Sequence, residues 1–287
     1  MFISGNKIVA LVDGSLYSAS VCDYAAWFAN KAKVGVEIVH VLGRAEHVEA
    51  ADHSGAIALG ARTALLEELA DLDQKRAKLM AQKGRAILED ARLRLENAGI
   101  ADVSERLLHG DLLDSLPDLE QDARVILMGK RGEAADFAKG HLGSNLERVV
   151  RASEIPVLVA ARAFKPIGKV LLAFDGGPSS MKALDHIASS PVFAGLEVHV
   201  ASAHADESQA QLRLAIAEAA LQKAGFAPQL HVVNGPVDQA LAGLIEANGF
   251  DLLVMGAYGH SRIRNLVIGS TTEQMVRGCK VPIILMR

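Results

Sequence analysis

Cysteine and aromatic residues are both scarce in this chain. Among its 287 residues there are only two cysteines, Cys22 and Cys279. This excludes a disulfide framework and a four-cysteine metal site. Aromatic residues make up 4% of the chain, and the apolar residues are mostly Ala, Val, Leu and Ile. This composition is typical of helices packed on a parallel sheet.

Long hydrophobic runs and an excess of positive charge are also missing. The formal net charge is −4, which argues against a nucleic-acid partner because phosphate backbones favour broad basic surfaces. The longest apolar runs, such as "KVLLAF" and "DLLVMG", have the length of strands and not of membrane spans. The first apolar run meets Asp13 too early for a signal peptide. We therefore predict a cytoplasmic protein with no nucleic-acid or membrane partner.

Familiar phosphate-binding and metal-binding motifs do not occur. The sequence contains no G-x-x-x-x-G-K-[ST] loop, no G-x-G-x-x-G after its first strand and no HExxH pair. His40 and His199 occupy matching places, but they follow apolar strand residues and we interpret them as structural. We predict no metal site, and any anion site must be a local feature.

The sequence contains one pattern of motifs that occurs twice. "KIVALVDGSLYS" from Lys7 matches "KVLLAFDGGPSS" from Lys169, and four further pairs follow in the same order. These are "VEIVHV" with "LEVHV", "NAGIADVSERLLHGDLLDSL" with "KAGFAPQLHVVNGPVDQAL", "ARVILMGKRG" with "FDLLVMGAYG", and "IPVLVAAR" with "VPIILMR". The chain therefore reads as two copies of one domain, residues 1–163 and 167–287.

The first copy carries an insertion. The stretch from His40 to His109 exceeds the matching stretch from His199 to Asn234 by about thirty residues, which we place at about residues 44–76. Its sequence predicts a helix that continues to Asn97. A lid or interaction arm is one interpretation, and a longer surface helix is the simpler one.

Short apolar runs alternate with helical periodicity in each copy. In the first copy the strand-like runs are residues 7–12, 35–41, 103–109, 124–129 and 156–161, and helix-like stretches lie between them. This alternation predicts an α/β fold with a parallel sheet covered by helices on both faces. In such sheets small ligands bind beyond the carboxyl ends of the strands, where the strand order reverses.

Chemically suitable residues fall at those strand ends. Asp13 and Asp175 follow the first strands, and Gly129 and Gly256 close the fourth strands. In the second copy, "GAYGHSRIRNLVIGSTTE" then places glycines around a basic loop and hydroxyls at a helix start. Glycines permit close approach, and unpaired amides at a helix start attract phosphate. His260, Arg262 and Arg264 supply positive charge.

Each of these residues also has an ordinary structural explanation. Ser270-x-x-Glu273 and Ser144-x-x-Glu147 are capping boxes. Asp13 and Asp175 could cap the helices that follow them, and paired glycines after a strand usually form a turn. Only the combined spacing favours a binding site.

That spacing resembles the nucleotide-binding motif of the universal stress protein family. The resemblance lies in Gly256-x2-Gly259-x9-Gly269-Ser270-Thr271, preceded by a strand ending in Met255. The segment "FDGGPSS", the His199-Val200 pair taken to end the second strand, and "VVNGP" also fit. The similarity covers the chain as two tandem copies, apart from the insertion.

The resemblance implies two tandem open parallel five-stranded sheets of strand order 3-2-1-4-5, with adenine near the aspartate and phosphates on the glycine loop. The adenine-nucleotide (ATP) residues that it implies in the second copy are Asp175, Val200, Met255, Gly256, Gly259, His260, Arg262, Gly269, Ser270, Thr271 and Thr272. Mg²⁺ could accompany the triphosphate, although there is no dedicated carboxylate cluster.

The first copy departs from the motif. Ten residues separate Gly132 from Gly143, Asn145 replaces the threonine, and Glu133 and Asp136 would repel phosphate. A weaker site is implied at Asp13, Val41, Gly129, Gly132, Gly143, Ser144 and Asn145. We therefore predict that nucleotide prefers the second copy.

Two functions from different classes follow from the resemblance. The first is a stress-response ATP-binding module that regulates partners, because no general base is evident. The second is a slow ATPase or a nucleotide-using transferase, with His260 or Asp175 positioning water or substrate. A scaffold with vestigial sites is a third. The family also implies that the fifth strands pair as an internal pseudo-dimer, and we expect the chain to form a homodimer.

Overall fold

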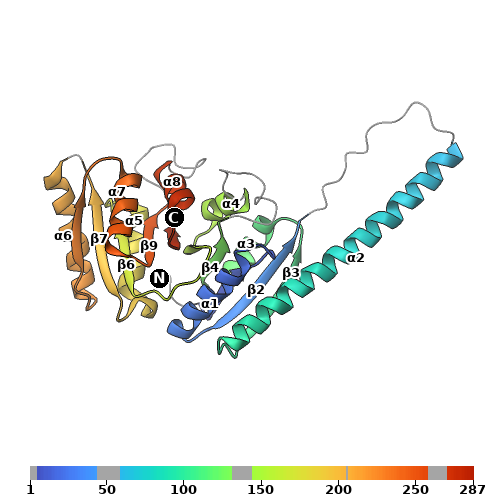
Figure 1. Cartoon of the computed structure of the whole chain (residues 1–287), viewed down its shortest axis with the longest axis horizontal. Helices are drawn as coiled ribbons and strands as arrows, with labels where there is room; N and C mark the ends of the chain where they lie inside the picture. The colour runs from blue at the N-terminus through green and yellow to red at the C-terminus, as the bar shows by residue number, and fades with distance from the viewer. Residues whose placement is uncertain (1–4, 44–58, 131–143, 205, 258–269) are drawn as a thin grey trace.

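The computed structural model describes residues 5–43, 59–130, 144–204, 206–257 and 270–287. Within them the chain folds as two similar α/β repeats that follow one another in the sequence (Figure 1). The elements of the first repeat are β1 (Lys7–Leu11), α1 (Ser18–Ala32), β2 (Gly35–Leu42), α2 (Leu59–Asn97), β3 (Val103–His109), α3 (Leu112–Glu120), β4 (Ala123–Gly129), α4 (Ser144–Ala152) and β5 (Val157–Ala160).

The second repeat contains the same order of strands and helices, with one added turn of 3-10 helix, η2. Its elements are β6 (Lys169–Ala173), α5 (Pro178–Ser189), η2 (Pro191–Phe193), β7 (Glu197–Ala203), α6 (Glu207–Lys223), β8 (Gln229–Val233), α7 (Val237–Asn248), β9 (Leu252–Gly256), α8 (Ser270–Gly278) and β10 (Ile283–Met286). The five short apolar runs of the first repeat all became strands. Strands β1, β4 and β5 are mostly apolar because the sheet is covered on both faces, whereas the edge strand β3 (VSERLLH) is polar and partly exposed.

The strands form one sheet of ten, in the order β3-β2-β1-β4-β5-β10-β9-β6-β7-β8. Each repeat therefore has the strand order 3-2-1-4-5, which confirms the prediction. The sheets of the two repeats are not separate, because β5 pairs antiparallel with β10, with Leu158 opposite Ile284. This pairing covers two apolar strand edges that would otherwise be exposed to association.

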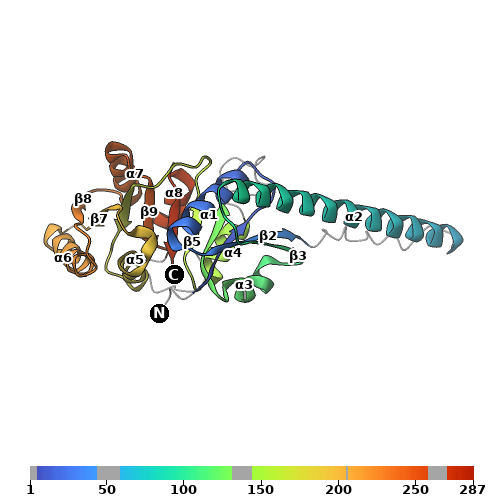
Figure 2. The same cartoon turned by 90° about the horizontal axis from the view of Figure 1, so that it is seen from below.

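Two hydrophobic cores lie on opposite faces of this sheet, and both extend through the two repeats. One is built on α1, α2, α5 and α6, with Phe28, Leu95, Leu184 and Leu221 among its buried residues. The other is built on α3, α4, α7 and α8. Figure 2 shows the helices distributed on both sides of the sheet.

Polar contacts add to the joint between the repeats. The Lys130 ammonium donates to the carbonyl of Cys279, and Arg287 Nη1 donates to the carbonyl of Ala152 over 3.3 Å. Each cation thus meets carbonyls at the end of a helix, where positive charge is favourable.

The insertion of the first repeat forms the start of a long helix. Helix α2 has 39 residues, against 17 in its counterpart α6. Figures 1 and 2 both show its first half extending away from the body of the molecule. The prediction of a helix that continues to Asn97 agrees with this element.

Candidate functional site

The loop after β6 holds Asp175 at the carboxyl end of the strand. Its Oδ1 accepts hydrogen bonds from the Gly177 amide at 2.8 Å and from Ser180 Oγ at 2.6 Å. Gly176, which lies between Asp175 and Gly177, has a φ of +76°, a conformation that favours glycine. The carboxylate is therefore fixed in place at the start of α5.

Asp13 has the same arrangement in the first repeat. Its Oδ1 accepts from the Ser15 amide at 3.0 Å and from Ser18 Oγ at 3.2 Å. Since β1 neighbours β4 and β6 neighbours β9, each aspartate lies on the same sheet edge as the glycine that closes the fourth strand. The structure thus brings Asp13 near Gly129, and Asp175 near Gly256, as the sequence predicted.

Gly256 has a packing reason for being glycine. A Cβ at this position would lie 2.9 Å from the Cβ of Ser179 and 3.0 Å from the Ser180 amide. The end of β9 therefore approaches the start of α5 more closely than any larger residue allows. The preceding residue, Met255, is buried in the strand.

The phosphate-loop residues lie largely outside the described part of the chain. Those outside it are Gly132, Gly143, Gly259, His260, Arg262, Arg264 and Gly269. Helices α4 and α8 do begin at Ser144 and Ser270, the serines that the sequence placed at helix starts. Thr271, in the first turn of α8, is partly exposed, and its counterpart Asn145 is exposed.

The hydroxyl of Thr272 has a structural role. Its side chain is buried, and its hydroxyl donates to the carbonyl of Ala257 over 3.1 Å. In the first repeat the same helical position is Leu146, which is also buried. The Thr272 hydroxyl therefore faces the core, and a contact between this residue and nucleotide stays a prediction.

The expected position of Val200 at the end of the second strand is wrong. The expectation was that His199 and Val200 end the second strand, but β7 continues to Ala203, and Val200 is fully buried in its middle. Lys7 pairs with Gly35 as Lys169 pairs with Glu197, so the residue that matches Val41 is Ala203. Ala203 lies at the carboxyl edge.

Arg213 on α6 was not anticipated at this edge. Its Nη1 donates to the carbonyl of Ala203 over 3.5 Å, and its side-chain stem lies beside Gly176. In the first repeat, Ile87 of α2 lies beside the matching Gly14. A cation thus borders the second edge where an aliphatic side chain borders the first.

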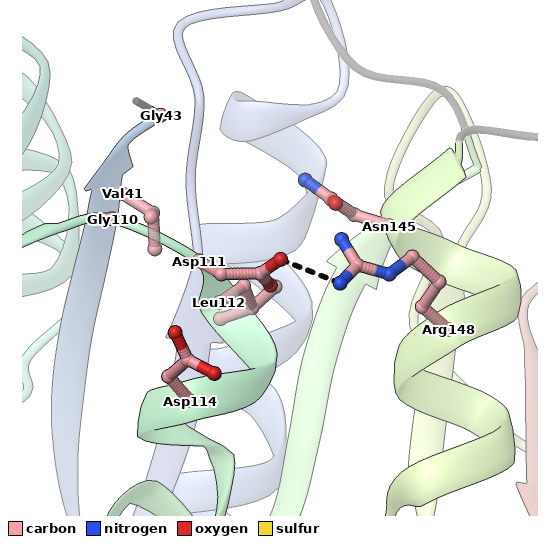
Figure 3. Close-up of a pocket in the computed structure, with 8 residues that line it drawn as sticks. All are labelled: Val41, Gly43, Gly110, Asp111, Leu112, Asp114, Asn145 and Arg148. Carbon is pink, nitrogen blue, oxygen red and sulfur yellow. Dashed lines mark hydrogen bonds and ion pairs between the residues drawn. The ribbon is translucent and has the colours of Figure 1, made fainter. Parts of the chain in front are cut away.

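A cavity of about 510 Å³ opens at the carboxyl edge of the first repeat (Figure 3). Its size lies within the range of small-molecule sites, roughly 300–1,000 Å³. The lining residues come from the ends of β2 and β3 and the first turns of α3 and α4. They are Val41, Gly43, Gly110, Asp111, Leu112, Asp114, Asn145 and Arg148.

An ion pair crosses this cavity. Arg148 reaches from α4 to Asp111, with 2.6 Å between Nη2 and Oδ2, and Asn145 extends toward the same space (Figure 3). Asp111 also caps α3 by accepting from the Leu113 amide at 2.9 Å. The sequence "HGDLLDSL" carries this capping signal, although its place in a cavity depends on how α3 and α4 pack together.

The same positions of the second repeat are uncharged. Asp111, Asp114 and Arg148 correspond to Pro236, Gln239 and Gln274. The first cavity therefore carries two carboxylates and one guanidinium, a net negative lining, whereas the second repeat presents none of these charges. Phosphate groups are repelled by the first arrangement and not by the second.

Both cysteines are unsuited to nucleophilic chemistry. Burial raises the pKa of the Cys22 thiol to about 12 and also raises the pKa of Cys279. Both thiols are therefore protonated at neutral pH. Among the described residues, no group of His, Cys, Asp and Glu side chains is arranged to hold a metal ion, and no helix has the length and apolarity of a membrane span.

Comparison with known families decides which family this duplicated fold represents. The profile of the universal stress protein family matches residues 5–161 and again residues 166–287. The chain belongs to the universal stress protein family. A universal stress protein of Synechocystis sp. is 42% identical over 285 residues, which cover 98% of this chain and 99% of that protein.

Solved structures show the same tandem fold. A universal stress protein from Archaeoglobus fulgidus has a TM-score of 0.73 at 22% identity, covering 99% of this chain and 98% of its own. A putative universal stress protein from Pseudomonas aeruginosa has a TM-score of 0.62 at 16% identity, with 99% and 94% covered. This tandem member of the family thus shares its whole architecture with relatives of distant sequence.

Proposed function

We propose that this universal stress protein is an adenine-nucleotide-binding regulatory module that takes ATP, with Mg²⁺, at the carboxyl edge of its second repeat. The observation that carries the proposal is the edge itself. A fixed aspartate, a glycine-closed strand and a helix start come together on neighbouring strands in both repeats. Sheets of this kind bind ligands at that edge.

The preference for the second repeat rests on charge. Pro236, Gln239 and Gln274 replace the charged lining of the first repeat. Arg213 adds a cation beside the Asp175 loop. The glycine and hydroxyl spacing from Gly256 to Thr271 is complete only in this repeat. In this proposal Asp175 and Ala203 face the nucleoside, and the start of α8 faces the phosphates.

We place the protein in the cytoplasm as a homodimer of the whole chain. Within each chain, the β5–β10 contact would act as a subunit contact acts between two proteins, so that the repeats form an internal pseudo-dimer. The proposed role is regulatory, because the described edge offers no evident general base for hydrolysis.

Binding stoichiometry in magnesium-ATP tests the proposal by isothermal titration calorimetry. We expect one tight site per chain, weakened about tenfold by Asp175→Asn because the amide lacks the charge that a ribose hydroxyl would meet. The matched variant Asp13→Asn should leave the tight site unchanged. Two equal sites, or equal effects of the two variants, would contradict the preference, and no binding would overturn the proposal.

Phosphate release separates this role from an enzymatic one. Steady-state turnover on the order of 1 per second or faster, lost in Asp175→Asn, would replace the regulatory module with an ATPase.

A further inference from the structure

The first half of α2 has no packing partner among the described residues of this chain. Every side chain from Leu65 to Met80 is exposed, whereas Gly84, Leu88 and Leu95 farther along the helix are buried against the body. Figures 1 and 2 show this half standing clear of the sheet. A helix of this length without tertiary contacts is marginally stable in water.

This exposed half carries an apolar stripe. Leu65, Leu69, Leu72 and Leu79 are exposed by between 46% and 65%, and Met80 by 44%. Their spacing of three, four and seven residues places them within an arc of about 100° on the helix. Leu65, Leu72 and Leu79 repeat every seventh residue, the period of a coiled-coil contact.

The stripe does not simply continue the face that packs on the body. Gly84, Leu88 and Leu95 lie roughly a quarter of a turn away from it around the helix. On the exposed half, the body-facing direction carries Ala70, Ala77 and one leucine, Leu66, which is 57% exposed. The leucines of the stripe therefore form a second apolar face, apart from the one that packs on the body.

The charges along this half change sign near its middle. Residues 67–73 contain Glu67, Glu68, Asp71 and Asp73, and residues 75–85 contain Lys75, Arg76, Lys78, Lys83 and Arg85. Two parallel copies would bring like charges together. Two antiparallel copies bring each acidic segment beside a basic one, which favours pairing.

We propose that α2 pairs antiparallel with α2 of a second copy of this chain, through the stripe Leu65, Leu69, Leu72 and Leu79. With the twofold axis near Gln74, Leu69 lies against Leu79 of the other copy, and the acidic segment 67–73 runs alongside its basic segment 75–85. Leu72 lies against the aliphatic stem of Arg76, whose charge remains in water. Such a contact is self-complementary and closed, as a twofold dimer requires.

This inference gives a surface to the homodimer proposed above, and it does not depend on nucleotide binding. Sedimentation velocity of the full chain tests it. The wild type should be a dimer, and the double variant Leu69→Glu with Leu79→Glu should weaken dimerisation on the order of a hundredfold or more, since four buried leucines become charged. Leu212→Glu on α6 is the matched control, because Leu212 is also exposed, by 59%.

Cysteine crosslinking tests the orientation. An equal mixture of Leu69→Cys and Leu79→Cys chains should form 69–79 disulfides between chains, whereas parallel helices would join 69 to 69 and 79 to 79. The native cysteines, Cys22 and Cys279, are buried and should not form crosslinks.

Several outcomes would overturn the proposal. They are a wild-type monomer, a dimer that survives the double glutamate variant, loss of the dimer in the Leu212 control, and the parallel crosslinking pattern. A monomer that sediments with anionic phospholipid vesicles through the same leucines would assign the stripe to a lipid surface instead. Magnesium-ATP titration of the double variant keeps the two proposals separate, because nucleotide binding should be unchanged whether or not the dimer forms.

Discussion

The two repeats place different chemistry at the same three strand positions. In the first repeat, the buried Glu37 pairs with Lys7 at 2.7 Å and with Arg106 at 2.6 Å. The matching residues of the second repeat are His199, Lys169 and His231. His199 Nδ1 lies 2.8 Å from His231 Nε2, and its Nε2 lies 2.6 Å from Glu197.

This difference shows that the fold fixes the positions without fixing how charge is balanced there. One repeat uses an ion triad of one carboxylate and two cations. The other uses two stacked imidazoles, 5.1 Å apart between ring centres, with Glu197 beside one of them. The carboxyl edges differ in the same way, with Asp111, Asp114 and Arg148 on one side and uncharged residues on the other.

The largest expected effect is the loss of the first repeat's central carboxylate. Glu37→Ala leaves Lys7 and Arg106 facing each other without their shared partner, and should lower the free energy of unfolding by about 3 kcal/mol. Urea denaturation measures this. The control is Glu197→Ala in the second repeat, where the half-exposed carboxylate should matter much less. If both variants lost the same free energy of unfolding, the two repeats would rely equally on these carboxylates.

The next largest expected effect is a loss of stability at acidic pH. Burial lowers the pKa of His186 to about 4, and burial also lowers the pKa of His231. Because the unfolded chain binds these protons more readily, stability is complete above about pH 6.5 and is lost as the pH falls toward 4. His186 alone should cost about 2 kcal/mol between pH 7 and pH 5.

Urea denaturation of the His186→Phe variant sharpens this test. The position corresponds to Tyr24 in the first repeat, where no imidazole titrates. The variant should flatten the dependence of the unfolding free energy on pH over this window, whatever its absolute stability. An unchanged slope would exclude His186 as the source.

The smallest expected effect exchanges the charges of the two binding edges. Asp111→Asn with Asp114→Asn keeps an effective helix cap but removes two carboxylates from the first cavity. Calorimetric titration should then show its affinity for magnesium-ATP rising by roughly three- to tenfold. The reverse variant, Gln239→Asp, should weaken the second site by a similar factor. If neither affinity moves, cavity charge does not set the preference between repeats.

The strands and their order were predictable because the chain repeats its apolar runs in order. The prediction that His199 and Val200 end the second strand failed for an identifiable reason. It aligned the two copies on the dipeptide His-Val, which occurs at different heights in β2 and β7. Counting without gaps from Lys7 and Lys169 would have placed Ala203 opposite Val41, because the repeats keep the same length through α1 and α5.

Other features needed the folded structure. A hydroxyl at a helix start looks alike whether it faces a ligand or the core, and Thr272 faces the core because α8 turns that position toward Ala257. The cavity beside Asp111 depends on how α3 and α4 pack together. The exposed stripe of α2 depends on which side of the helix meets the sheet, which leucine spacing alone does not specify.

The pairing of β5 with β10 joins the two repeats through one sheet and two shared cores. The part of the chain that is repeated is therefore smaller than the part that packs together. A fragment ending near residue 163 would keep its five strands in order but lose part of each of the two cores, and it would present Val157, Leu158 and Val159 along a bare strand edge. Each half therefore relies on the other to cover the edge of its fifth strand. We expect that heating which unfolds one half also uncovers the other, so that the two repeats unfold in a single transition.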